Sequence, residues 1–219
     1  MVTRALGLNV DFQLQSVPLL SRVGADRADN LRTDVEAAIA GWADAALLRV
    51  DSRNQVLVAN GRVVLGSAAA LADKPPPDAV FLARIEGGRH VWAIRGALEA
   101  PKDLDVQAEV LNLRSLGPIL DDTSSQLVSS AIALLNWHDK ARFSAADGSP
   151  TKLARAGWAR VNPVTGHEEF PRIDPAVICL VHDGGDRLAH HVPRHPALER
   201  GDAISGAYRL AVVEFQPVP

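Results

Sequence analysis

The side chains near the end of the chain that are best suited to chemistry are three histidines and a single cysteine. His190, His191 and His195 lie close together in the sequence, and imidazole is a common metal ligand. A proline interrupts the group and no fourth ligand follows, so a solvated loop is favoured over a metal cluster. Cys179 lies in the apolar run 176–181 without a neighbouring base, which favours a buried structural role over catalysis. No Ser-His-Asp arrangement, P-loop or dinucleotide-binding glycine pattern is visible.

A more specific pattern lies in the middle of the chain. It consists of Ala-Leu-Leu-Asn-Trp-His at 133–138, Arg-Phe at 142–143, Gly-Trp-Ala-Arg at 157–160, and Glu-Phe-Pro-Arg-Ile-Asp-Pro-Ala-Val-Ile at 169–178. One short motif would mean little, but four in a fixed order and spacing make chance agreement improbable. In that order and spacing the segments resemble the NADH pyrophosphatases of the Nudix hydrolase family. The N-terminal part resembles that family too, so the resemblance runs to about Arg187.

The resemblance implies an architecture and a substrate. In this family an N-terminal mixed domain, often with a zinc ribbon, and a C-terminal Nudix domain form a homodimer that hydrolyses the pyrophosphate of NADH, NAD or NAD-capped RNA. Magnesium or manganese serves the intact family. The resemblance therefore implies NADH or an NAD-type dinucleotide as the ligand and a homodimer as the assembly. It places Phe170 where the family has an aromatic ring that stacks on the substrate base, and the alternative is that Phe170 only anchors a strand.

The sequence departs from the family in the zinc ribbon. Family members with a ribbon carry two Cys-x-x-Cys pairs, whereas the matching positions here are Ser144, Asp147, Asn162 and Thr165. No thiolate is available at these positions, and oxygen ligands on loops hold zinc poorly. We therefore expect that the zinc site is lost, that no zinc is bound and that the chain has no metal-ligating residue.

A second departure concerns the catalytic carboxylates. Nudix chemistry needs a helix with the pattern Arg-Glu-x-x-Glu-Glu to hold magnesium or manganese, and no such pattern follows Arg187. Glu199, Asp202 and Glu214 are too scattered to form one helix face. We expect a truncated or divergent Nudix domain without catalytic residues, and both a frame change after Arg187 and true divergence stay open. The favoured interpretation is a family member that is unable to hydrolyse the pyrophosphate alone. The alternatives are a non-catalytic remnant for nucleotide binding or dimerisation, and an activity retained through unrecognised groups.

Composition excludes several other classes of function. Hydrophobic residues make up 47% and charged residues 22% of the 219 residues, as in ordinary globular proteins. The net charge is −3 and no long basic block occurs, so neither duplex DNA nor an anionic membrane is an expected partner. No apolar run approaches the roughly 20 residues that span a bilayer, and residues 1–10 lack a signal pattern. We expect a cytoplasmic protein.

The elements that must position these residues predict an α+β fold. Apolar residues spaced by three and four predict a helix over 30–42, and the capping box formed by Thr123 and Gln126 predicts a second helix up to Trp137 and His138. We interpret that last pair as packing and a hydrogen-bonded cap. Strands are expected at 45–50, at 55–59 and 62–65 around an Asn-Gly turn, at 80–86 and 89–95, at 170–181, and at 208–215 as a covering strand.

These elements predict three parts. Residues 1–140 form an N-terminal domain of β-hairpins and helices that is like that of NADH pyrophosphatases. Residues 141–166 form a degenerate zinc-ribbon-like subdomain without cysteines. Residues 167–219 form the first strands of an incomplete Nudix α/β/α domain with a divergent tail. Unpaired strand edges in such a partial domain favour dimerisation or poor solubility.

Overall fold

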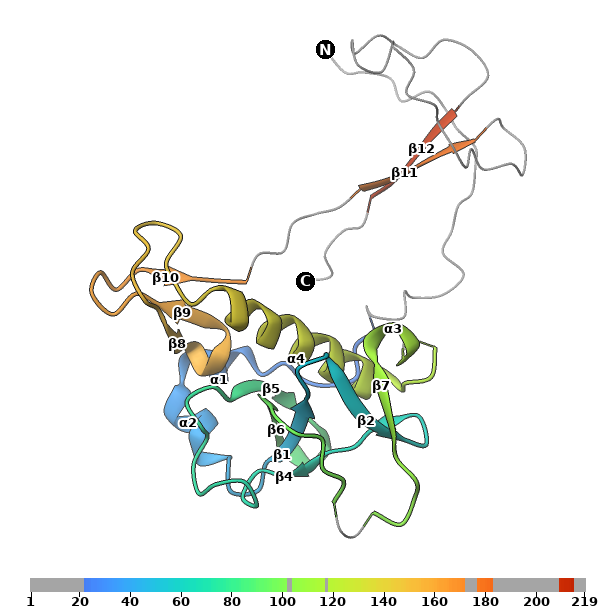
Figure 1. The fold of residues 1–219 in the computed structure, drawn as a ribbon, viewed down its shortest axis with the longest axis horizontal. Helices are drawn as coiled ribbons and strands as arrows, with labels where there is room; N and C mark the ends of the chain where they lie inside the picture. Colours follow the sequence, from blue (N-terminus) through green and yellow to red (C-terminus); the bar gives the residue numbers. More distant parts are fainter. Residues whose placement is uncertain (1–21, 102–103, 117, 172–176, 183–208, 215–219) are drawn as a thin grey trace. The chain divides into compact units, whose positions relative to one another are not determined.

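The computed structural model describes residues 22–101, 104–116, 118–171, 177–182 and 209–214 (Figure 1). The chain divides into two compact units, Met1–Pro171 and Arg172–Pro219. Helices and sheets occur together, which confirms the α+β fold class. Asp174 and the three histidines His190, His191 and His195 lie outside the described residues. None of the described helices is long and apolar enough to cross a membrane.

The second unit contains one described antiparallel pair of strands. In it β11 (Val177–His182) pairs with β12 (Arg209–Glu214), so that Val177 lies opposite Glu214 and His182 opposite Arg209. The expected covering strand over 208–215 is therefore confirmed, and it pairs with the apolar run that contains Cys179.

A four-stranded sheet forms the centre of the first unit. Its strands lie in the order β4 (Gly66–Ser67), β1 (Ala46–Val50), β6 (His90–Arg95) and β5 (Val80–Arg84). The central pair, β1 and β6, is parallel, and the outer pairs are antiparallel. The 3-10 turn η2 (Glu86–Gly88) joins β5 to β6, which confirms the hairpin predicted around its two glycines.

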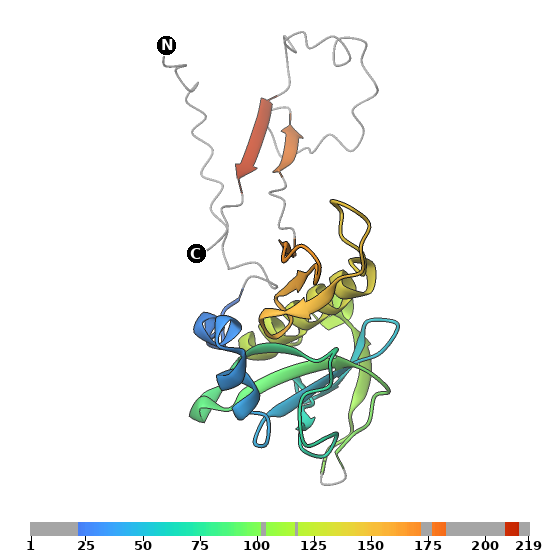
Figure 2. The same ribbon diagram turned by 90° about the vertical axis from the view of Figure 1, so that its left-hand side faces the viewer.

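Successive side chains of a strand point to opposite sides of a sheet. Helices cover this sheet on both sides, so both of its faces are buried. Long helix α4 (Asp122–Lys140) lies along one face (Figures 1 and 2). The apolar cluster between them includes Leu48, Val50, Leu82, Leu127, Val128 and Ala131. Two short helices, α1 (Asp29–Thr33) and α2 (Val35–Ala40), cover the other face. Their cluster includes Leu31, Ala38, Trp42, Leu47, Phe81 and Trp92.

The prediction of a single helix over 30–42 is wrong, because the segment forms two short helices, α1 and α2. Asp34 adopts φ −95° and ψ 79°, which is not helical, and its backbone N–H still bonds to the carbonyl of Asn30 at the end of α1. Its side chain accepts a hydrogen bond from the backbone N–H of Ala37, 3.0 Å away, and so caps α2. An aspartate often caps a helix in this way, because its carboxylate satisfies an N–H that the first turn leaves unpaired.

A second, three-stranded sheet has the order β3-β2-β7. The strands β2 (Gln55–Ala59) and β3 (Arg62–Val63) meet at Asn60 and Gly61, whose φ angles of 49° and 72° are those of the predicted type I′ turn. The expected strand 62–65 is shorter than predicted, because the chain moves into β4 of the other sheet at Gly66. Neither β7 (Glu109–Asn112) nor α3 (Leu113–Leu116) was predicted.

The predicted capping box at the start of α4 is wrong, because its two residues do not cap the helix. Asp121 is the N-cap, and its carboxylate accepts a hydrogen bond of 2.7 Å from the N–H of Ser124. Thr123 donates its hydroxyl to the carbonyl of Gly24. Gln126 binds the same segment, since its amide accepts from the N–H groups of Gly24 and Ala25. These two side chains therefore tie a distant segment to the helix instead of capping it.

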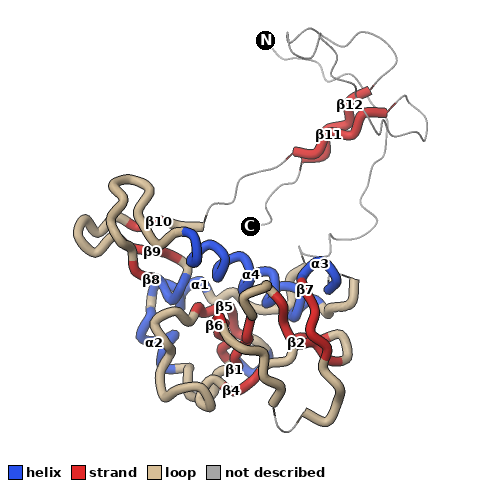
Figure 3. The backbone as a smooth tube through the Cα atoms, viewed as in Figure 1, coloured by secondary structure: helices blue, strands red, loops and turns tan. Residues whose placement is uncertain are grey.

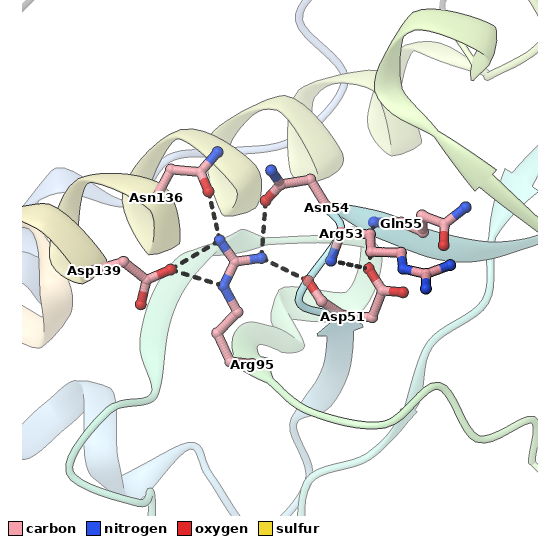
Figure 4. A network of polar contacts seen from close by, with 7 residues as sticks. All are labelled: Asp51, Arg53, Asn54, Gln55, Arg95, Asn136 and Asp139. Carbon is pink, nitrogen blue, oxygen red and sulfur yellow. Dashed lines mark hydrogen bonds and ion pairs between the residues drawn. The ribbon is translucent and has the colours of Figure 1, made fainter.

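Arg95, at the end of β6, joins α4 to the turn after β1 (Figure 4). Its guanidinium donates to the side chains of Asn136 and Asp139 on α4. It also donates to the carbonyl of Asp51 and to the side chain of Asn54, both at 2.8 Å. Four partners around one guanidinium fix the helix against the sheet, because each bond constrains a planar group from a different direction.

Candidate functional site

The segment after α4 forms a small three-stranded ribbon. It contains β8 (Lys152–Ala154), the 3-10 turn η3 (Arg155–Gly157), β9 (Ala159–Val161) and β10 (Glu168–Glu169). The sheet order is β10-β9-β8 with antiparallel pairing throughout. Figure 3 shows these strands beside the end of α4 from which the chain enters the ribbon.

Two turns of the ribbon are linked by hydrogen bonds. In the first, the N–H of Gly148 bonds to the carbonyl of Ser144, and the carboxylate of Asp147 accepts from the N–H of Ser149. In the second, the amide oxygen of Asn162 accepts from the N–H of Val164 at 3.0 Å. The buried Asn162 side chain also donates to Asp147 across the two turns, with a shortest distance of 3.0 Å. Hydrogen bonds from the backbone and side chain of Ser149 lower the pKa of Asp147.

The turn η3 fixes the ribbon to the central sheet. Arg155, Ala156 and Gly157 all have positive φ, at 52°, 51° and 94°, which is unfavourable for residues with a Cβ atom. A Cβ on Gly157 would lie 2.5 Å from Cγ1 of Val80, so only glycine fits. The next residue, Trp158, donates its indole N–H to the carbonyl of Phe81 at 2.6 Å.

A buried polar network joins the end of α4 to β9. His138 lies 2.7 Å from the carbonyl of Gly157 through Nε2, and 3.1 Å from the guanidinium of Arg160 through Nδ1. Arginine can only donate, so Nδ1 accepts and Nε2–H donates, which makes the ring neutral. Arg160 also donates to the hydroxyl and carbonyl of Thr151. The structure thus gives His138 a buried, hydrogen-bonded position, as interpreted from the sequence.

Phe170 is exposed beside an ion pair. Its ring is 53% exposed, and the guanidinium carbon of Arg155 lies 5.6 Å from the ring centroid. Arg155 is held in place by Glu168, to which Nε and Nη2 donate at 2.9 and 2.8 Å. We call Phe170, Arg155 and Glu168 the stacking site. The arrangement offers a flat apolar surface next to a guanidinium that a carboxylate holds in place.

The strand expected over 170–181 is wrong at its start. The strand β10 ends at Glu169, and the next described strand is β11. Pro171 follows Phe170 and has no N–H to donate to a neighbouring strand. The interpretation of Phe170 as the anchor of a core strand is therefore incorrect, because its side chain faces solvent.

Arg155 and Glu168 were not identified from the sequence. Neither residue has a recognisable motif spacing, and their pairing depends on the unusual backbone of η3. The glycine of the Gly-Trp-Ala-Arg segment is the signal that could have found them. Glycine adopts a positive φ without strain and lets another part of the backbone approach closely. The glycine of this segment could therefore have indicated a tight turn at this place.

The four positions that match the cysteines of the family carry hydroxyl, carboxylate and amide groups. The hydroxyl oxygens of Ser144 and Thr165 and the carboxylate of Asp147 accept hydrogen bonds within the ribbon, and the amide nitrogen of Asn162 donates one to Asp147. They differ from the thiolate set of a structural zinc. Within the described ranges, no group of three or more His, Cys, Asp and Glu side chains is arranged to hold a metal ion.

Comparison with known proteins identifies the ribbon and its relatives. The family "NADH pyrophosphatase zinc ribbon domain" matches residues 139–170. "NAD-capped RNA hydrolase NudC" from Mycobacterium tuberculosis and from Mycobacterium bovis is 79% identical over 178 residues, which is 81% of this chain. The chain spans 57% of the length of these relatives. The human mitochondrial "NAD(P)H pyrophosphatase NUDT13" is 34% identical over 94 residues, covering 42% of this chain and 27% of the relative.

The comparison corrects two expectations from the sequence. The match over 139–170 shows a zinc ribbon domain and points to a zinc site, so the expectations of a lost zinc site and of no zinc are wrong. Those expectations rested on four positions without cysteine, whereas the family match covers the whole segment. The expectation of a truncated chain is contradicted too, because the zinc ribbon family matches this segment and the relatives that are 79% identical are hydrolases.

Proposed function

Because this chain belongs to the NADH pyrophosphatases of the Nudix hydrolase family, we propose that it binds NAD-type dinucleotides, either free NADH or the NAD cap of an RNA. The observation that carries this proposal is the stacking site. An exposed aromatic ring with a guanidinium 5.6 Å from its centre offers a planar base an apolar face. The relatives named as acting on NAD-capped RNA and NAD(P)H support this choice of ligand.

The charge of Arg155 suits the phosphates of such a ligand. Its Nε and Nη2 bind Glu168, and its Nη1 has no polar partner among the residues that the structure describes. A guanidinium fixed on one side and open on the other can donate to a phosphate oxygen without first becoming ordered. Phe170 would then hold a base while Arg155 contacts the adjoining phosphate.

Hydrolysis of the pyrophosphate is not assigned to these residues. The 219-residue sequence contains no Arg-Glu-x-x-Glu-Glu pattern, and pyrophosphate hydrolysis of the Nudix type needs clustered carboxylates to seat divalent cations. The proposal is therefore a family member that binds the dinucleotide but does not split it alone. A remnant that serves only dimerisation is the alternative. Family resemblance also supports a homodimer, which sedimentation velocity of the full chain would test.

Binding can be tested by titrating the full chain with NADH in a calorimeter. Replacing Phe170 with alanine should weaken NADH binding about fivefold to a hundredfold, the range for loss of one base–aromatic contact. Phe143→Ala is a matched control, because Phe143 is an aromatic residue of the same segment that is 62% exposed. Equal affinities for the parent chain and Phe170→Ala, or equal losses in both variants, would contradict the role of the stacking site.

Catalysis needs a separate measurement. The full chain is incubated with NADH and either magnesium or manganese, and release of nicotinamide mononucleotide is followed by chromatography. We expect no turnover above that of buffer. Turnover that a chelator abolishes would show that an intact catalytic centre exists, and the proposed lack of hydrolysis would be wrong while dinucleotide binding could still hold.

A further inference from the structure

A cavity of about 810 Å³ opens in the first unit and has no role in the function proposed above. It is bordered by the ends of β1 and β2, by β3 and β4, and by residues 99–101, 104 and 106. None of its lining residues belongs to the ribbon. Its volume falls within the range of small-molecule sites, about 300–1,000 Å³.

The charged lining of this cavity is mainly positive. Arg49, Arg62 and Arg89 line it, against the single carboxylate of Glu99. The three arginines come from separate parts of the chain, namely β1, β3 and the residue before β6. The fold therefore gathers cations around one space, although the whole chain has a net charge of −3.

Two of these arginines have few partners. The side chain of Arg49 is only 24% exposed, yet its one ion pair, with Glu99, is long at 3.8 Å. The side chain of Arg49 makes no hydrogen bond within the described part of the chain. Arg89 donates only through Nε, to the carbonyl of Asp44 at 2.9 Å, so both of its Nη groups lack a partner among the described residues. The guanidinium of Arg49 and the two Nη groups of Arg89 are therefore available to donate charge-assisted hydrogen bonds to an anion in the cavity.

Much of the rest of the wall is apolar. Val63, Leu65, Leu104 and Val106 line the same space as the arginines. A ligand that matches both parts has an anionic group and a flat, weakly polar body. Arginine suits phosphate in particular, because its fork of N–H groups fits two phosphate oxygens at once.

We propose that this cavity binds a nucleoside phosphate, with the phosphate on Arg49 and Arg89 and the base against the apolar wall. The nucleotide can be free in solution or can be part of an RNA strand, since both present the same group. This assignment does not depend on the stacking site.

The test uses two probes, ADP and a 5′-phosphorylated octaribonucleotide, with inorganic pyrophosphate as the reference anion. All three are titrated into the full chain carrying Phe170→Ala, so that the stacking site does not contribute to the signal. Arg49→Gln and Arg89→Gln are then added separately, and Arg53→Gln serves as a control. Arg53 is an exposed arginine outside the cavity lining whose side chain has no ion pair within the described residues.

Either substitution in the cavity should weaken binding about tenfold or more, the loss expected for one charge-assisted hydrogen bond, whereas Arg53→Gln should leave it unchanged. Dependence of ADP binding on Arg49 and Arg89 identifies a free nucleotide as a sufficient ligand. The same dependence for the octaribonucleotide alone identifies an RNA strand as the source. Because Arg89 is exposed, its variant keeps the test valid if Arg49→Gln fails to fold. No binding of either probe, equal losses in all three variants, or ADP binding no tighter than inorganic pyrophosphate would overturn the proposal.

Discussion

The buried His138 should make the stability of the protein depend on pH near neutrality. His138 and Arg160 are only 8% and 7% exposed, and their side chains lie 3.1 Å apart. Burial is the main cause that lowers the pKa of His138, and the charge of Arg160 adds to it, while the Gly157 carbonyl and the Asp139 carboxylate act in the opposite direction. The folded protein therefore favours the neutral ring.

The sign and size of the effect follow from proton linkage. An unfolded histidine titrates near pH 6.5, whereas the folded His138 titrates at a lower pH. Below about pH 6.5 the unfolded state holds more protons, so the free energy of unfolding falls as the pH falls. The stabilisation by His138 is fully present above that pH and is lost towards its lowered folded pKa. One proton changes the free energy by at most about 1.4 kcal/mol per pH unit, so the loss between about pH 7.5 and pH 5.5 is up to about 1.4 kcal/mol.

Urea denaturation at a series of pH values measures this quantity. The matched variant is His138→Gln, which has an amide donor and acceptor but does not titrate. The parent chain should lose up to about 1.4 kcal/mol more than the variant over this range, because titrating carboxylates affect both alike. Should the variant fold poorly, NMR titration of the His138 ring in the parent gives the same answer. Parallel stability curves, or a ring that titrates at pH 6.5 or above, would refute the reasoning.

Four further substitutions test other parts of the fold, each by urea denaturation against the parent. Gly157→Ala should cost about 2–4 kcal/mol, because its Cβ would lie 2.5 Å from Val80 at a positive φ; a loss below about 1 kcal/mol would show that η3 relaxes. Arg95→Met should cost about 2–3 kcal/mol, because it leaves several polar partners unpaired, and a neutral result would mean that water replaces them. Asp121→Ala should cost about 1 kcal/mol as the N-cap of α4, whereas Thr123→Ala should cost about half of that or less; the reverse order would restore the capping box predicted from the sequence.

Local signals predicted much of the fold. The type of the turn at Asn60 and Gly61 was predicted correctly, because few amino acids adopt positive φ angles at two successive positions. The long helix α4 was correct within two residues, because its apolar spacing is continuous over many turns. The pairing of β11 with β12 was also expected from their apolar character. In each of these elements the sequence pattern and the tertiary environment favour the same local structure.

The errors arose where distant residues decide the local structure. Thr123 and Gln126 have the spacing of a capping box, but the segment at Gly24 and Ala25 takes their hydrogen bonds. Strand β7 has an exposed pattern with little β signal, and it exists because it pairs with β2. The ion pair of the stacking site likewise depends on the turn η3 meeting strand β10 in the ribbon. Spacing along the chain carries no information about such contacts.

The stacking site is coupled to the interior through one turn. Arg155 is the first residue of η3 and binds Glu168 next to Phe170. Gly157, the last residue of the same turn, lies against Val80. A shift of Gly157 must therefore move Arg155, since only Ala156, itself at a positive φ of 51°, lies between them. Gly157→Ala should consequently weaken NADH binding even at temperatures where the variant stays folded. A folded Gly157→Ala chain with the parent's NADH affinity would show that the ribbon holds its site without help from the central sheet.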